Sequence, residues 1–195
     1  MPVWLIAVLA VGATAMVCVG ASFFGAISVL VPRIQEKQAR ATCANQLRQL
    51  GGLYIQDSME RGQAPPAGGA AYLVGLARKS GAQPSLLVCP VDTHIAVAHA
   101  FTETPPESLG AADLRQICSY VVHDFARYPL DEYADEIIAA DAGGHHGKGI
   151  NVLRSDGAVQ FLDRAALGLG PDDDIIVGPD SPHLELQKLC IVPAR

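Results

Sequence analysis

The first 31 residues carry no charged side chain, and this long apolar stretch constrains the fold more than any other feature of the sequence. A helix of about 20 apolar residues is enough to cross the hydrocarbon core of a bilayer. Within lipid a helix is required, because backbone amides have no water to satisfy them. The stretch has no basic residue ahead of its apolar run, and it is too long for a cleaved secretory signal. The sequence therefore predicts a retained transmembrane helix over residues 1–31, with the lipid bilayer as its partner.

The segment that follows keeps a helical pattern but becomes amphipathic. Its apolar residues recur at spacings of four, three and four, at Cys43, Leu47, Leu50 and Tyr54. Such spacings place side chains on one face of an α-helix. We therefore predict that the membrane helix continues through Pro32 into an amphipathic helix over residues 32–60. Its apolar face needs a surface to cover.

Residues 61–195 are predicted to form a globular α+β domain. A helix is expected at 70–79, and strands are expected at 117–123, 136–141, 150–154 and 158–162. The last two strands flank an Asp156-Gly157 step, which predicts a hairpin because Gly accepts the positive φ of a tight turn. We expect the amphipathic helix to cover a three- or four-stranded antiparallel sheet. The proline-containing C-terminal tail is expected to be irregular and to lie on the surface.

Charge and motif content exclude several classes of function. The net charge is −6, and basic residues cluster only between residues 33 and 48. Nucleic acid is therefore not an expected partner, because phosphate binding needs a basic surface. No phosphate-binding glycine loop or Gly-x-Ser-x-Gly nucleophile motif is found. We expect neither a cofactor nor enzymatic activity.

Four cysteines fall after the apolar stretch, at Cys43, Cys89, Cys118 and Cys190. In an exported domain this even number is compatible with one or two disulfides, in any of three complete pairings. In the cytosol the same residues would stay reduced. No Cys-x-x-Cys pair is present, so the spacing does not indicate a zinc ribbon.

His145 and His146, close to Asp141, are the residues with the most suitable chemistry for metal binding or acid–base catalysis. Neighbouring residues in an extended chain point to opposite sides, which weakens a joint role. We favour a structural role for His146, hydrogen-bonded into the hairpin that contains Asp156, and we keep a metal site and catalysis as alternatives. The acidic run at 172–174 lacks the spacing of an EF-hand and is expected to be solvated.

Three segments resemble the bacterial type IV pilin and pseudopilin family. The segment VPRIQEKQARATCANQLRQLG is similar to the family's helix as it leaves the membrane, with Pro32 at the kink and Cys43 before an Asn-x-Leu-x-Gln-like run. The segment VCPVD resembles a Cys-Pro-x-Asp motif of the family. His146, followed after nine residues by Asp156-Gly157, resembles the His–nine residues–Asp-Gly signature of one large group of pilin-like proteins.

The resemblance implies a pilin-like fold and a structural role in a type II secretion or type IV pilus-like system. Its partners would be other pilin-like subunits or components of the secretion machine. Prepilins also carry a Gly-Phe cleavage site and a Glu five residues into the mature chain, and the corresponding positions here are Ala10, Val11 and Ala15. We therefore expect an uncleaved, single-pass protein of the bacterial cytoplasmic membrane.

The side of the membrane on which the domain lies has conflicting indications. The resemblance implies the periplasmic or extracellular side. The basic flank that follows the apolar stretch, taken alone, would place the domain in the cytoplasm by the positive-inside rule. Two alternatives to assembly also remain, a membrane-tethered binding module and a metal-dependent enzyme.

Overall fold

A helix of 59 residues, α1 (Val3–Arg61), begins the chain and continues through Pro32. The computed structural model describes the backbone of all residues except 1–2, 63–64, 66–67, 93–104, 131–134, 143–145 and 193–195. Side chains are described for the same residues, with the further exception of 3–30 and 107. The predicted membrane span, residues 1–31, lies almost wholly outside the residues with described side chains. Within the described part of the chain, no helix is both long enough and apolar enough to cross a bilayer.

The chain forms two units, Met1–Gln38 and Ala39–Arg195. We call the second unit the head. The boundary falls inside the segment 32–60 that we predicted as the amphipathic continuation of the membrane helix, so α1 from Ala39 onwards is part of the head. The predicted division at residue 61 differs from this boundary because it follows the end of the helix and not the packing of its apolar face.

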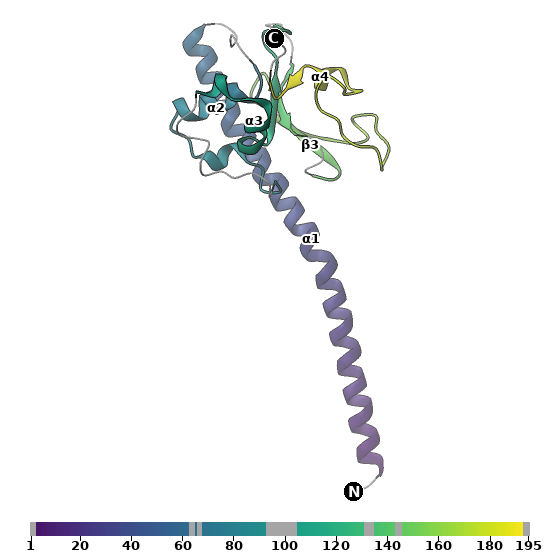
Figure 1. Ribbon diagram of the computed structural model, residues 1–195. Helices are drawn as coiled ribbons and strands as arrows, with labels where there is room; N and C mark the ends of the chain where they lie inside the picture. The colour runs from purple at the N-terminus through teal and green to yellow at the C-terminus, as the bar shows by residue number, and fades with distance from the viewer. Residues whose placement is uncertain are drawn as a thin grey trace. The chain divides into compact units, whose positions relative to one another are not determined.

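The head has an α+β fold built on an antiparallel sheet of five strands in the order β4-β3-β2-β1-β5 (Figure 1). The strands are β1 (Tyr120–His123), β2 (Ile137–Asp141), β3 (Gly149–Arg154), β4 (Val159–Asp163) and β5 (Leu189–Cys190). The helices besides α1 are α2 (Ala70–Lys79), α3 (Ala111–Ile117) and α4 (Leu184–Gln187), with short 3-10 turns η1 (Pro84–Leu87) and η2 (Pro106–Ser108). The helix predicted at 70–79 and the four predicted strands all form, with shifts of up to three residues at their ends.

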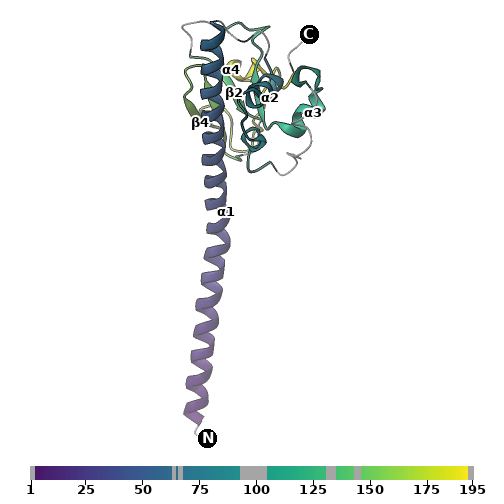
Figure 2. The ribbon, with the colours of Figure 1, turned by 90° about the vertical axis from the view of Figure 1, so that its left-hand side faces the viewer.

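The amphipathic face of α1 covers one face of the sheet, as predicted (Figure 2). Cys43, Leu47 and Leu50 are completely buried there, against residues of α2, β1 and β3. The approach is close, because a Cβ on Gly51 would come within 2.7 Å of Leu153 Cδ1. We call this side of the sheet the helix face.

The opposite side of the sheet is also covered, and here the prediction of a surface tail is wrong. Leu167, Ile175 and Leu186 from the C-terminal segment are buried against Val121, Ile150 and other residues of the strands. The tail then adds β5 to the edge of the sheet beside β1. We call this side the tail face. The predicted irregular path is only partly right, because α4 and β5 form within the tail. The apolar residues between its prolines form a covering layer that the proline pattern alone does not indicate.

The predicted hairpin forms from β3 and β4, with five residue pairs in register. Gly157 in its turn has a φ of +85°, and Asp156 Oδ1 accepts a 2.7 Å hydrogen bond from the Ala158 N–H. A Cβ on Gly157 would lie 2.7 Å from Ile55 Cδ1 of α1. Glycine is therefore needed here both for the backbone angle and for the close approach of the helix.

Candidate functional site

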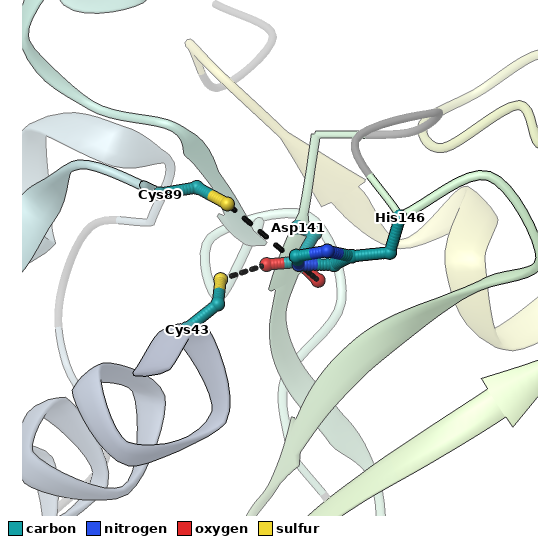
Figure 3. A group of neighbouring side chains, drawn as sticks. All are labelled: Cys43, Cys89, Asp141 and His146. Carbon is teal, nitrogen blue, oxygen red and sulfur yellow. Dashed lines mark hydrogen bonds and ion pairs between the residues drawn. The ribbon is translucent and has the colours of Figure 1, made fainter. Parts of the chain in front are cut away.

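Four side chains from separate parts of the head meet in its interior, on the helix face of the sheet (Figure 3). Their sulfur, nitrogen and oxygen atoms all lie within 4.8 Å of one another. The members are Cys43, Cys89, Asp141 and His146. We call them the buried cluster, because each is at most 1% exposed.

Each member is placed by a different element. Cys43 comes from the buried face of α1, and Cys89 follows η1. Asp141 is the last residue of β2, where it pairs with Tyr120 of β1 and so shares the helix face with it. His146 lies in the connection between β2 and β3. In Figure 3 the two sulfurs and the imidazole converge on the Asp141 carboxylate.

The Asp141 carboxylate and His146 Nε2 make most of the contacts within the cluster. The Cys43 thiol donates a 2.7 Å hydrogen bond to Asp141 Oδ1, and the backbone N–H of Asn151 donates a 2.8 Å bond to Asp141 Oδ2. His146 Nε2 lies 3.4 Å from Asp141 Oδ2 and 3.6 Å from Cys89 Sγ. The same imidazole nitrogen therefore faces both a carboxylate and a sulfur.

A second layer of polar groups holds the two cysteines. The Tyr120 hydroxyl lies 3.4 Å from Cys43 Sγ and donates a 3.0 Å hydrogen bond to Gln46 Oε1. The Cys89 N–H donates a 2.9 Å hydrogen bond to Ser119 Oγ, which fixes the chain after η1 to the residue before β1. The arrangement around both sulfurs is thus determined by groups from α1 and the sheet.

Burial shifts the pKa values of these groups towards their uncharged forms. Removal from water raises the pKa of the Asp141 carboxyl above its ordinary value. A hydrogen bond with Cys89, burial and the charge of Asp141 together raise the pKa of the Cys43 thiol. Burial likewise raises the pKa of the Tyr120 hydroxyl. A buried cation would reverse this balance, because it stabilises thiolate and carboxylate together.

The cluster contains the residue types of a Cys-His-Asp catalytic triad, but its geometry differs. In a triad the carboxylate binds Nδ1 of the histidine while Nε2 faces the nucleophile. Here Asp141 and Cys89 both face Nε2, and Nδ1 of His146 has no hydrogen-bond partner among the described residues. Cys89 is also completely buried, whereas a catalytic nucleophile must contact its substrate. The arrangement does not support nucleophilic catalysis.

The structure brings together some of the predicted site residues and separates others. Asp141 and His146 meet, whereas His145 lies outside the described residues. Contrary to the preferred prediction, the contacts of His146 are with Asp141 and Cys89, and Asp156 instead stabilises its own turn. The acidic run at 172–174 is exposed, as expected.

The four described cysteines are all thiols in this structure. Cys118 donates a weak 3.5 Å hydrogen bond to the Tyr120 carbonyl, and Cys190 lies on the edge strand β5, so neither belongs to the cluster. The disulfide pairings considered from the sequence remain predictions. What sequence reasoning missed is that Cys43 and Cys89 join the Asp141–His146 pair.

One signal in the sequence pointed to this grouping. Each of the three segments that carry the pilin-like resemblance contributes one member, namely Cys43, Cys89 and His146. No family model, curated protein or solved structure matches the chain. The function is therefore argued from the residues and the geometry.

Proposed function

We propose that this chain is a pilin-like, single-pass membrane protein with a structural role. It would serve as an uncleaved subunit or accessory protein of a type II secretion or type IV pilus-like system, with its head outside the bacterial cytoplasmic membrane. The observation that carries the proposal is the burial of the C-terminal part of α1, from Cys43 to Tyr54, in the head. A helix that starts in a charge-free apolar segment ends as a core element of the globular part.

This use of one helix for two purposes suits a structural subunit. Cys43, Leu47 and Leu50 are fully buried, so the helix cannot leave the head without exposing its core. A flexible tether would hold a binding domain equally well and would need no such packing.

The apolar segment also offers surfaces for association. Gly12, Gly20 and Gly25 allow neighbouring helices in a bilayer to approach closely. Ala15 stands where the family carries its Glu, so the charge that selects the register of incoming subunits is missing. The proposal is accordingly a membrane-held assembly component and not a processed filament subunit.

Membrane extraction and protease protection test the placement. The full-length protein should stay with the membrane fraction after alkaline carbonate washing, and protease added to intact spheroplasts should digest the head. Release by carbonate would overturn the membrane assignment. Protection of the head would place it in the cytoplasm, as the basic flank indicates, and would overturn the proposed role.

Cysteine crosslinking tests assembly. We expect Gly12→Cys and Gly25→Cys, each in a Cys18→Ser background, to give disulfide-linked dimers in native membranes. The Cys18→Ser protein without either substitution is the matched control, because it keeps all cysteines of the head. Monomers only in both variants would favour a tethered binding module over an assembly component.

A further inference from the structure

We propose that the buried cluster is a structural zinc site that holds the head together. Its ligands would be the side chains of Cys43, Cys89, Asp141 and His146. This inference concerns the interior of the head and is independent of the proposed membrane placement and assembly.

The donor set is the first argument. Two thiols, one imidazole and one carboxylate supply four atoms of the types that bind zinc, and structural zinc sites have four protein ligands. Thiolate ligands also select zinc over magnesium or calcium, which prefer oxygen. No local motif announces the site, because Cys43, Cys89 and Asp141 come from distant parts of the chain.

The distances are the second argument. A tetrahedral zinc ion with bonds of about 2.0 Å to nitrogen or oxygen and about 2.3 Å to sulfur separates its nitrogen and sulfur ligands by roughly 3.6 Å, and its nitrogen and oxygen ligands by roughly 3.3 Å. His146 Nε2 lies 3.6 Å from Cys89 Sγ and 3.4 Å from Asp141 Oδ2. Both distances from His146 Nε2 therefore match the edges of a zinc tetrahedron, and the remaining ligand atoms lie within 4.8 Å of one another.

Cys43 supplies the fourth corner after a small movement. Its Sγ now lies 2.7 Å from Asp141 Oδ1, the distance of a hydrogen bond in which the thiol proton is shared with the carboxylate. Zinc would replace that proton. Binding would convert the thiols of Cys43 and Cys89 to thiolates and release two protons to solvent, with no change in oxidation state. The Tyr120 hydroxyl, 3.4 Å away, could then turn its proton from Gln46 Oε1 to the thiolate.

The groups around the cluster act as an outer shell for the ligands. The Asn151 N–H fixes Asp141 Oδ2, and Ser119 Oγ fixes the backbone of Cys89. Metal-binding carboxylates and thiolates are commonly oriented by hydrogen bonds of this kind. A disulfide between Cys43 and Cys89 would instead remove the thiol donor from Asp141 and leave its carboxyl group buried beside the imidazole.

The site fits a structural role and not a catalytic one. Catalytic zinc keeps one position open for water or substrate, whereas all four positions here are filled by the protein. The site would join α1, the segment after η1 and the sheet at one point. These segments have no other covalent connection near the cluster among the described residues.

Metal content of the full-length protein is the direct test. The protein would be purified in detergent with a reductant and without a histidine tag, and zinc would be measured by elemental analysis. We expect about one zinc per chain, and after replacement by cobalt we expect the near-ultraviolet absorption of sulfur-to-cobalt charge transfer. A folded protein that neither contains zinc nor takes up cobalt would overturn the proposal, as would a Cys43–Cys89 disulfide found by mass spectrometry.

Variants identify the ligands. Cys89→Ser and His146→Ala should each weaken zinc binding by more than roughly 100-fold, because even loss of an outer-shell partner costs about 10- to 100-fold. Cys118→Ser is the matched control, since Cys118 is a buried thiol outside the cluster and its loss should leave the metal content unchanged. Full zinc content in both ligand variants would overturn the site. The measurement on the unaltered protein decides the question even where a variant fails to fold.

Discussion

The two faces of the sheet are stabilised in different ways. The tail face is lined by apolar residues such as Val121, Ile150 and Val152, and its covering layer of Leu167, Ile175 and Leu186 is apolar too. The helix face combines an apolar core with the buried Asp141 and His146. Apolar packing needs only a suitable volume, whereas each buried polar group needs a specific partner. The helix face should therefore respond to metal, to protons and to the exact position of α1, and the tail face should not.

Removal of metal is expected to have the largest effect. A ligand present at 1,000 times its dissociation constant stabilises the folded state by about 4 kcal/mol, so a strong chelator should lower the unfolding free energy of the zinc-loaded protein by at least about that amount. Thermal unfolding of the full-length protein, followed by circular dichroism, measures the change. The Cys89→Ser protein should show no further loss with chelator.

Leucine truncations on the two faces sharpen the comparison. Leu47→Ala and Leu186→Ala remove side chains that are almost fully buried, so each should cost roughly 2–5 kcal/mol. Leu47 lies one helical turn from Cys43, so its effect should not add to that of chelation, whereas the effect of Leu186→Ala should add. Denaturant titration of each protein with and without chelator measures the cost of each truncation and shows whether it adds to the cost of chelation. If the effects of both truncations add to that of chelation, the proposed difference between the two faces is wrong.

Acid should act through His123, whose ring stacks on Phe125 of the core that lines the helix face. Burial lowers the pKa of His123 to about 4, although Glu136 and Asp124 oppose the shift while Lys188 reinforces it. An unfolded histidine has a pKa of about 6.5, so between these values the unfolded chain binds more protons and stability falls as the pH falls. The loss attributable to His123 should reach about 3 kcal/mol at pH 4.

Unfolding free energies of the His123→Gln protein and the unaltered protein isolate this contribution. Both proteins keep the buried cluster, so its own response to acid cancels in the difference. We expect the difference in unfolding free energy between the two proteins to change by about 3 kcal/mol between pH 7 and pH 4. A proton that only the unfolded chain binds lowers the unfolding free energy by about 1.4 kcal/mol for each unit by which the pH falls. A constant difference over this range would contradict the assignment.

The smallest effect concerns the fit of α1 against the hairpin. Gly157→Ala forces a side chain into a backbone with a φ of +85° and against Ile55, so it should cost about 2 kcal/mol. Gly81→Ala is the matched control, because Gly81 has a φ of +69° but nothing within 4 Å of its added Cβ, and it should cost only about 1 kcal/mol. Chemical denaturation of both variants gives the difference, and equal costs would show that the helix tolerates the added methyl group.

Much of the fold could be predicted because its signals are local. The spacing from Cys43 to Tyr54 identified the buried face of α1, and Asp156-Gly157 identified the hairpin. The two-residue strand β5 and the covering role of Leu186 were missed, since both depend on contacts with strands far away in the sequence. Local periodicity carries no information on such contacts.

The site was predicted only in part for the same reason. Asp141 and His146 are five positions apart and were noticed together. The thiol of Cys43 is 98 positions from Asp141, and no spacing rule connects them. The sequence offers four cysteines of equal standing, whereas the fold brings only Cys43 and Cys89 into the buried cluster.

The distance along the chain between Cys43 and its partner strand has a consequence for biosynthesis. The buried face of α1 leaves the ribosome long before β1, β2 and β3 have been made. At about 5–20 residues per second, the 98 residues that separate Cys43 from Asp141 take roughly 5–20 seconds to translate. During that interval Leu47 and Leu50 have no sheet to cover, so the apolar face of the nascent helix stays exposed until the strands have been made.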